Sequence, residues 1–410
     1  MHTARLLRLS EDLPILDEVV DSEEEIDRRR IMDRRDFLRA GAAAGAAGLG
    51  QLVAFPGRTL AAPQVPGQQA SSASAIRLNS NENPLGLSPS ARMAVERAIA
   101  EANRYPDAAR EELARDIAAK LGVKSENIVL GNGSTEILQI IVQASDATHG
   151  TLVMADPTFE AISFYQRTLT YTTEKVPLSS SYAHDLQQMK DRVAAGNGPA
   201  VVYLCNPNNP TGTLTASAEI DAWIEEAPET VQFAVDEAYF EYVGAPGYWS
   251  AIKWIQDRPN VIVARTFSKI CGMAGMRLGY AVAHSETAGR LREFLTWDNA
   301  NSLALAAGLA SLADDGLEAR GKAVNEVALT MTRNCLDELG LEYLPSHTNF
   351  LMHRIQGDVR EYIGRMRDRG LHVGRPFPAL PSFNRLSMGL PEEMEIWAET
   401  LKEFRQKGWV

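Results

Sequence analysis

Short apolar runs alternate with helix-like segments through the middle of this chain, from about residue 128 to residue 283. Runs such as Ala200–Cys205 and residues 231–235 have the length and the β-branched composition of buried strands. Strands that alternate with helices in this way form a mostly parallel sheet with helices on both faces. We therefore predict a doubly wound α/β sheet in a large domain, with a ligand site at the carboxyl ends of its strands.

Composition and charge exclude several classes of function. The chain has 410 residues and a formal net charge of −12, which disfavours an electrostatic partner such as nucleic acid or an anionic membrane. Its three cysteines, Cys205, Cys271 and Cys335, are odd in number and far apart, so we predict neither a disulfide framework nor a zinc site. The seven histidines show no ligand spacing, and we expect no metal.

Residues 1–62 differ in composition from the rest of the chain. Arg34-Arg35 precedes a Gly/Ala-rich run over residues 40–55 and then small residues, which resembles a twin-arginine export signal. The run is too short and too Gly-rich to span a membrane. An acidic stretch precedes the arginines, so translation could instead start at Met32. The alternative to an export signal is an N-terminal tail that merely contains Arg-Arg. We expect the twin-arginine machinery to carry the protein to the periplasm or another extracytoplasmic compartment. If the signal is unused, we expect the protein to stay in the cytoplasm.

One loop holds a lysine and an arginine in a run of small residues. Residues 260–264 form a predicted strand, and Lys269 and Arg277 follow in the connection that leaves it. A lysine at this edge of a sheet is a salt-bridging surface residue, a phosphate ligand or a Schiff-base nucleophile. The surface interpretation is favoured for the lysine alone, so the choice depends on the segments around it.

A second loop has the pattern of a phosphate site. A Gly-Asn-Gly turn joins the predicted strand at residues 128–130 to a helix that begins at Ser134 and Thr135. The free N–H groups at such a helix start bind anions, helped by the helix dipole. An ordinary capped helix explains the same residues.

Other predicted strand ends carry side chains with two interpretations each. Phe159 could stack on a planar ring, but phenylalanine is more often core. Asn209, in a Pro/Gly-fixed loop, could donate an N–H group at a fixed place. Asp236 could pair with a protonated ring nitrogen or serve as a structural carboxylate. Arg385 could be a surface residue of a strand or a clamp for a substrate carboxylate.

Taken together, these segments resemble one enzyme family. The motifs, in chain order, are G-N-G-S-T-E, P-T-F, N-P-N-N-P-T-G, D-E-A-Y, T-F-S-K with an arginine eight residues on, and R-L-S-M-G. They resemble a fold-type I, class I/II aminotransferase that uses pyridoxal 5′-phosphate, nearest to the histidinol-phosphate aminotransferase branch. The resemblance covers residue 79 to the C-terminus and implies a large cofactor-binding domain plus a smaller α+β domain built from the chain ends.

The resemblance implies a role for each matching residue around the cofactor ring. Lys269 would bind the cofactor aldehyde covalently and later move a proton to and from the substrate Cα. Asp236 would keep the ring nitrogen protonated, so that the ring can accept electrons. Asn209 and Tyr239 match the pair that hydrogen-bonds the phenolic oxygen, and Phe159 would stack on the ring face.

The resemblance also implies where the anionic groups bind. Arg385 matches the clamp for the substrate α-carboxylate. Tyr105 matches a tyrosine that reaches the cofactor phosphate from a neighbouring subunit, which implies a homodimer with shared active sites. The residues expected to bind the phosphate within one chain are Ser134, Thr135, Thr266, Ser268 and Arg277.

The predicted domain organisation follows from the composition and the motifs. The segments are a leader over 1–62, a linker over 63–75, an N-terminal arm and part of the small domain over 76–105, a large cofactor-binding domain over 106–300 and a C-terminal small domain over 301–410.

Two departures from the family pattern concern the substrate. Residues 79–86 lack the tyrosine that many histidinol-phosphate enzymes carry there, and Arg375 is displaced by one residue from the family's usual arginine. We therefore predict an exported aminotransferase of unassigned amino-acid specificity that follows a ping-pong cycle. The alternatives are a decarboxylase or lyase on the same scaffold, a histidinol-phosphate aminotransferase proper, and a noncatalytic cofactor-binding or regulatory protein.

Overall fold

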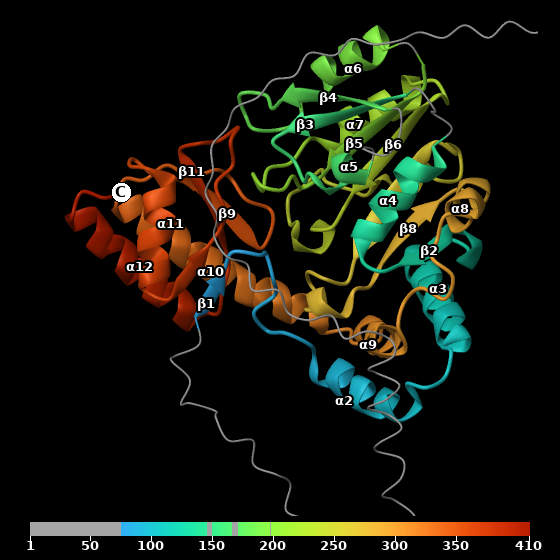
Figure 1. Ribbon diagram of the computed structural model, residues 1–410, viewed down its shortest axis with the longest axis horizontal. Helices are drawn as coiled ribbons and strands as arrows, with labels where there is room; N and C mark the ends of the chain where they lie inside the picture. Colours follow the sequence, from blue (N-terminus) through green and yellow to red (C-terminus); the bar gives the residue numbers. More distant parts are fainter. Residues whose placement is uncertain (1–74, 146–149, 166–170, 197) are drawn as a thin grey trace, which may run out of the picture. The chain divides into compact units, whose positions relative to one another are not determined.

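The computed structural model describes residues 75–145, 150–165, 171–196 and 198–410 (Figure 1). The predicted export signal lies outside the described residues, and so does the predicted linker except for Ala75. The rest of the description concerns the described part of the chain.

The middle of the chain forms a seven-stranded sheet (Figure 1). All its neighbouring strands pair in parallel, except that β8 is antiparallel to both β2 and β7. This topology confirms the predicted, mostly parallel sheet. In order of pairing, the strands are β2 (Ile128–Gly131), β8 (Gly279–Ala283), β7 (Val261–Thr266), β6 (Val231–Asp236), β5 (Ala200–Cys205), β3 (Thr151–Asp156) and β4 (Thr172–Pro177).

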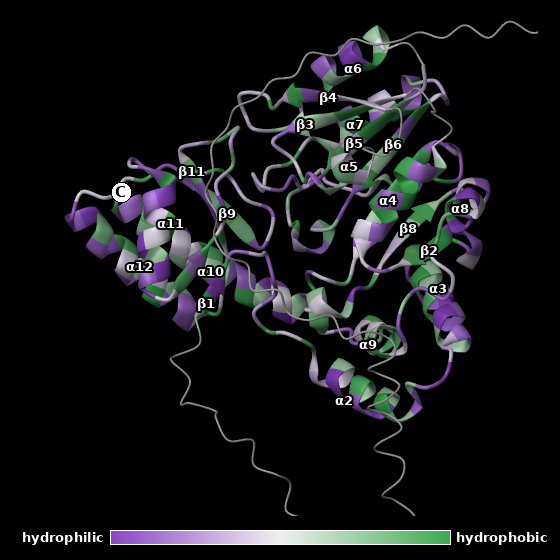
Figure 2. Ribbon diagram, viewed as in Figure 1, coloured by the Kyte–Doolittle hydropathy of each residue, from purple (hydrophilic) through white to green (hydrophobic). Residues whose placement is uncertain are grey.

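Helices cover both faces of this sheet because its strands are apolar on both sides. Along β5, Val202 and Leu204 face one helical layer, whereas Val201 and Tyr203 face the other. Figure 2 shows hydrophobic central strands beside helices of mixed character. The first layer contains α3 (Asp107–Leu121), α6 (Leu186–Ala195), α7 (Ser217–Glu226) and α9 (Ser302–Leu312), with α2 (Pro89–Ala98) against α9; the second contains α4 (Ser134–Ala144), α5 (Ala161–Tyr165) and α8 (Ser285–Arg292).

A smaller α+β part is built from both ends of the described chain, as predicted. The short strand β1 (Ile76–Leu78) pairs in parallel with β10 (Leu371–Val373), and β9 (Phe350–Arg354) pairs antiparallel with β11 (Phe383–Ser387). Its core packs around the fully buried Trp397. The helices of this part are α10 (Leu317–Glu338), α11 (Val359–Asp368) and α12 (Pro391–Gln406).

Element boundaries differ by a few residues from those expected. The helix predicted over residues 111–121 begins earlier, at Asp107, directly after Pro106. It ends as predicted at Gly122, whose φ of 68° is the left-handed conformation that glycine adopts readily. Within the described ranges, no helix is both long enough and apolar enough to cross a membrane. Short 3₁₀ helices lie at Ile99–Glu101, Ser125–Asn127, Phe240–Tyr242, Ala251–Trp254 and Ala274–Met276.

Candidate active site

A cavity of about 220 Å³ lies at the carboxyl ends of the central strands. Loops of the sheet supply most of its wall, and Ser80, Asn81 and Arg385 are contributed by the smaller α+β part. All the predicted site residues except Tyr105 line this cavity: Ser134, Thr135, Phe159, Asn209, Asp236, Tyr239, Thr266, Ser268, Lys269, Arg277 and Arg385.

Lys269 lies in the loop after β7, with its amine facing the cavity. Its Nζ donates a hydrogen bond to the backbone carbonyl of Asn81 at 3.2 Å and lies 5.5 Å from the ring centre of Tyr239. Burial, and then the positive charge of Arg385, lowers the pKa of Lys269 from 10.5 to about 8. The amine is therefore partly neutral near physiological pH, which is the form that attacks an aldehyde.

Asp236 ends β6 and is 2% exposed. Its Oδ1 accepts a hydrogen bond from the Ala238 N–H at 3.1 Å, and its Oδ2 accepts one from the Tyr203 hydroxyl at 2.9 Å. Neither donor is a cation, and burial raises the pKa of Asp236 to about 6. A buried carboxylate on a cavity wall, bonded only by neutral groups, fits a protonated ring nitrogen as its missing partner.

The start of α4 forms an anion cradle with Arg277. The N-cap residue Gly133 has a φ of 79°, and a Cβ added there would lie 2.2 Å from Arg277 Nη2. Only glycine lets the turn and the guanidinium approach so closely. The hydroxyls of Ser134 and Thr135 line the cavity and make no hydrogen bond within the described ranges. A helix start, free hydroxyls and an arginine together suit a phosphate dianion.

Two residues of the lysine loop extend this cradle. Thr266 ends β7, and its Oγ1 lies 2.9 Å from the hydroxyl oxygen of Ser268. Both side chains line the cavity. The Ser268 N–H also donates to Thr266 Oγ1 at 3.1 Å, so the loop's own hydrogen bonds fix where these hydroxyls point.

Asn209, Tyr239 and Phe159 complete the wall around the lysine. Asn209 Oδ1 accepts a hydrogen bond from Arg385 Nη1 at 2.7 Å, which leaves the Asn209 amino group as a donor. The Tyr239 hydroxyl accepts from Asn81 Nδ2 at 3.1 Å, and burial raises the pKa of Tyr239. Phe159 is partly buried and lines the same cavity. The arrangement places two polar donors and one aromatic face near Lys269.

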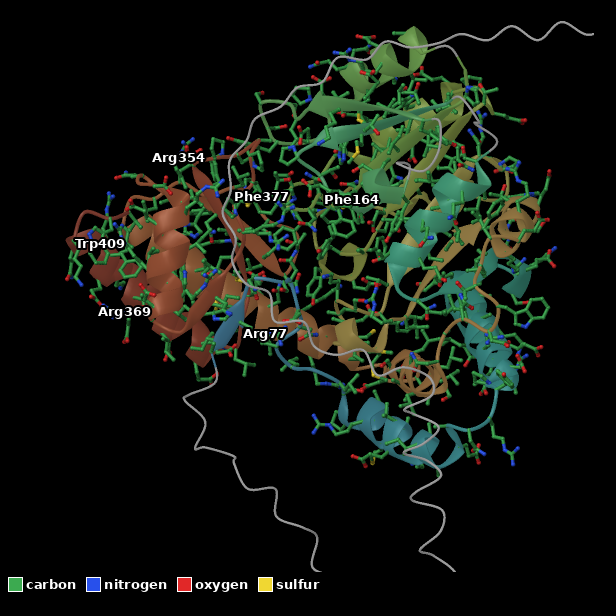
Figure 3. All side chains as sticks on the ribbon, in the orientation of Figure 1. Arg77, Phe164, Arg354, Arg369, Phe377 and Trp409 are labelled. Carbon is green, nitrogen blue, oxygen red and sulfur yellow. The ribbon has the colours of Figure 1, made fainter. Side chains whose placement is uncertain are left out.

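Arg385 reaches the cavity from β11 and has no carboxylate hydrogen-bonded to it among the described residues. Its guanidinium donates to Asn209 Oδ1 and, at 2.9 Å, to the Asn79 carbonyl, while its Nε is buried without a partner. The ring centre of Phe350 lies 5.6 Å from the guanidinium carbon, and that of Phe377, which is labelled in Figure 3, lies 5.4 Å from it. Burial lowers the pKa of Arg385 to about 10. A partly buried guanidinium that has no counter-ion among the described residues fits a bound carboxylate or phosphate.

Asn81 is a site residue that sequence reasoning did not find. Its φ is 53°, and the residue is 2% exposed. Its side chain bonds Tyr239 and, at 3.0 Å, Ser387, while its carbonyl accepts from Lys269 and from Asn349. The turn-rich pattern of residues 79–86 indicated a special loop, but nothing in it indicated these distant partners.

Tyr105 is the one predicted site residue outside the cavity. It lies between the first 3₁₀ helix and α3, and 78% of its surface is exposed. Within a single chain, the structure therefore does not bring Tyr105 to the other predicted residues. The prediction assigned it to the site of a neighbouring subunit, and it stays a prediction.

The residues in the cavity match the parts of pyridoxal phosphate one by one. A poised amine faces the place for the aldehyde, a buried carboxylate suits the ring nitrogen, and the α4 cradle suits the phosphate. The unpaired guanidinium of Arg385 remains for an anionic substrate group. The charges and hydrogen-bond donors of the lining residues therefore fit the cofactor.

Comparison with known proteins identifies the family of this chain. Residues 73–401 match the family model Aminotransferase class I and II. The histidinol-phosphate aminotransferase of Moorella thermoacetica is 37% identical over 331 residues, which are 80% of this chain and 85% of that protein. A solved structure from Erwinia carotovora atroseptica, with a provisional histidinol-phosphate aminotransferase name, is 38% identical with a TM-score of 0.80, covering 82% of this chain and 97% of that one.

A second solved structure includes the cofactor. The histidinol-phosphate aminotransferase of Sinorhizobium meliloti, in complex with pyridoxal-5′-phosphate, is 28% identical with a TM-score of 0.77, covering 82% of this chain and 91% of that one. These matches confirm the resemblance to a fold-type I aminotransferase that the motifs indicated. With 80% of its length matched at this level of identity, the chain belongs to the class I and II aminotransferase family.

Proposed function

We propose that this chain is a pyridoxal-phosphate-dependent aminotransferase that moves an amino group between an amino acid and a 2-oxo acid or related carbonyl compound. The observation that carries the proposal is one cavity in which the Lys269 amine, the Asp236 carboxylate and the Arg385 guanidinium converge. Bound pyridoxal phosphate supplies an electron-accepting ring, and the amino acid and oxo acid take turns in a ping-pong cycle.

The family resemblance gives each residue a role in this chemistry, and the position of the residue in the cavity supports that role. Asp236 holds a proton at the ring nitrogen, which keeps the ring electron-poor. The Asn209 amino group and the Tyr239 hydroxyl would donate hydrogen bonds to the phenolic oxygen of the bound cofactor. Phe159 covers a ring face and excludes water. Lys269 Nζ takes a proton from the substrate Cα and returns one, because its lowered pKa lets it act both as base and as acid.

Arg385 supports an amino-acid substrate. Its guanidinium has a free, buried Nε and a fixed orientation, so a substrate carboxylate can bind in the two-point geometry that arginine favours. Histidinol phosphate is the second candidate, and the names of the relatives favour it. Its phosphate would also suit Arg385, but the two departures at residues 79–86 and at Arg375 disfavour it. A decarboxylase or lyase outcome would use the same cavity.

The test is the visible spectrum of the purified protein with added pyridoxal phosphate and a panel of amines. An absorbance band at roughly 410–430 nm should shift towards roughly 330 nm with the physiological donor. Lys269→Ala should not turn over. Release of carbon dioxide without consumption of an oxo acid would indicate the decarboxylase, and a strong preference for histidinol phosphate would indicate that substrate. A protein that takes up no cofactor would refute the proposal.

We also propose that two copies of the chain share their active sites. Tyr105 is highly exposed, and it matches the tyrosine that contacts the phosphate from the neighbouring subunit in similar enzymes. Other apolar side chains are exposed as well, including Trp297 at 90% and Ile99 at 58%. Tyr105→Ala should weaken cofactor binding.

Subunit mixing tests the shared site directly. A hybrid of a Tyr105→Ala subunit and a Lys269→Ala subunit would contain one intact site, so random mixing of the two variants should restore about a quarter of the wild-type sites. No recovery after mixing, or a monomer by light scattering, would contradict the shared dimer.

The export of the protein is a separate proposal that rests on sequence alone. Arg34 and Arg35 precede a weakly apolar run, and the twin-arginine route carries folded proteins that have already bound a cofactor. Replacing both arginines by lysine should retain the protein in the cytoplasm. Cell fractionation of the wild type in a host with the export machinery measures this, and a wholly cytoplasmic wild type would contradict it.

A further inference from the structure

Among the described residues, the hydroxyl of Tyr203 is the one side-chain donor that hydrogen-bonds Asp236. Tyr203 lies on β5 and is fully buried. In the sheet register, Tyr203 pairs with Ala234 on β6. Asp236 follows Ala234 by two residues, so its side chain lies on the same face of the sheet as Tyr203. Its hydroxyl donates to Asp236 Oδ2 at 2.9 Å. In the sequence, Tyr203 lies in a buried apolar strand and carries no signal of a role at the site.

A phenylalanine would fill the apolar core at this position equally well. What tyrosine adds is one buried hydroxyl, and a buried hydroxyl is costly unless it has a partner. The hydrogen bond to Asp236 supplies that partner, and the Ala238 N–H holds the other carboxylate oxygen. The Asp236 side chain is thus fixed from two sides before any ligand binds.

We propose that Tyr203 is a positioning residue that orients the Asp236 carboxylate and keeps it ionised for the ring nitrogen of the cofactor. This inference rests on the proposed function, because it requires that the cavity binds pyridoxal phosphate. Tyr203 itself does not line the cavity, so any effect that it has on the cofactor through Asp236 is indirect.

The groups around Asp236 explain why a hydrogen bond from Tyr203 is needed to keep its carboxylate ionised. The neighbouring titratable groups among the described residues are Tyr203 and Cys205 on β5, Glu237 and Tyr239 just after β6, and Lys269 in the loop after β7. Burial favours the neutral acid, and the negative charge of Glu237 acts in the same direction; the two hydrogen bonds and Lys269 oppose both. Loss of the Tyr203 hydroxyl would raise the pKa of Asp236 further. A neutral Asp236 would no longer stabilise a protonated ring nitrogen.

Tyr203→Phe tests the inference, because it removes one oxygen and keeps the ring. We expect the Kd for pyridoxal phosphate to rise about tenfold. In the protein with bound pyridoxal phosphate, loss of the positive charge on the ring nitrogen should raise the pKa of Lys269 Nζ. When absorbance of the bound cofactor is measured against pH, the midpoint of the change should therefore rise by about one pH unit.

Tyr362→Phe is the matched control. Tyr362 is also fully buried, and its hydroxyl accepts one hydrogen bond, from Trp397 Nε1 at 3.3 Å, in the core of the smaller part. This variant should lose thermal stability but keep the wild-type cofactor affinity and titration midpoint. If Tyr203→Phe behaves in the same way, the Tyr203 hydroxyl is merely structural and the inference is wrong.

The variant Asp236→Asn provides a second measurement. If Tyr203 acts through the carboxylate, adding Tyr203→Phe to Asp236→Asn should change the titration midpoint no further. Additive shifts would contradict the inference. A wild-type protein that binds no pyridoxal phosphate would instead refute the proposed function, so the two failures are distinguishable.

Discussion

Lys269 shows how one buried residue sets the pH range of the chemistry. With a pKa of about 8, close to a tenth of its amine is neutral at pH 7, whereas at the ordinary value of 10.5 the neutral fraction is about 0.03%. Because the pKa is lowered, the neutral amine becomes the main form of Lys269 at a lower pH than in an ordinary lysine. Covalent capture of pyridoxal phosphate by the cofactor-free protein should therefore speed up about tenfold per pH unit below 8 and level off above it. Stopped-flow absorbance measures this rate.

A variant at Arg385 provides the control for this pH dependence. Arg385 is the largest charge that lowers the pKa of Lys269. Arg385→Met should move the midpoint of the capture rate to higher pH, while the limiting rate at high pH stays nearly the same. A midpoint near 10.5 in the wild type would show that Lys269 is not perturbed as described.

Asn81 allows the roles of backbone and side chain to be separated. Its φ of 53° is unfavourable for alanine but not for glycine, and both substitutions remove the amide that bonds Tyr239. We expect Asn81→Ala and Asn81→Gly to lower kcat similarly. Asn81→Ala should be less stable than Asn81→Gly by about 1 kcal/mol, because it adds backbone strain. Urea unfolding and steady-state kinetics measure the two effects, and equal stabilities would contradict the strain argument.

At the scale of elements, the start of α4 depends on a glycine that no other residue can replace. In Gly133→Ala, the new Cβ would collide with Arg277, at 2.2 Å from Nη2, and the φ of 79° would add strain. We expect the Kd for pyridoxal phosphate to rise more than about tenfold, because Arg277 must leave the cradle. Equilibrium titration with the cofactor measures this loss.

Gly247→Ala is the matched control for the cradle. Its φ is 81°, almost that of Gly133, but an added Cβ would meet nothing within 4 Å. This variant should lose a similar amount of stability from backbone strain, about 1 kcal/mol, and bind the cofactor normally. If both variants bind the cofactor equally well, the close approach of Arg277 to the turn is not needed for binding.

Strand ends were the most predictable elements, and the site residues on them were found for that reason. Apolar runs such as Val261–Thr266 are local in sequence, so they indicate where a strand ends and which side chain follows it. The antiparallel direction of β8 left no local signal, since Gly279–Ala283 reads like any buried strand. Asn81 was missed because its partners Tyr239 and Ser387 are 158 and 306 residues away along the chain. Tyr203 was missed because a buried tyrosine looks like core.

At the scale of the whole molecule, residues from both ends of the described chain meet loops of the sheet at the cavity. Arg385 bonds Asn209, and Lys269 bonds Asn81, so each contact joins the smaller part to a loop of the sheet. The motif order in the sequence indicated that the C-terminal part supplies an arginine. It could not indicate the salt bridge between Arg375 and Glu160, at 2.9 Å, which depends on how these parts pack.

This salt bridge has a testable effect on substrate choice. Glu160 and Arg375 are 39% and 53% exposed, so the pair should contribute less than about 1 kcal/mol to stability. Arg375 is close enough to Arg385 to lower its pKa. Glu160→Gln leaves the positive charge of Arg375 unpaired near the substrate position. We expect kcat/KM for glutamate, relative to leucine, to rise about two- to fivefold, and Arg375→Gln to lower the same ratio.

The salt dependence separates this electrostatic effect from a change of shape. A charge effect acting through partly exposed groups should shrink when the ionic strength rises to about 0.5 M, because the screening length then falls to a few ångströms. A change in packing between the smaller part and the sheet would leave the ratio insensitive to salt and would alter stability as well. If Glu160→Gln and Arg375→Gln shift the glutamate preference in the same direction, the bridge acts by holding the two parts together rather than by its charge.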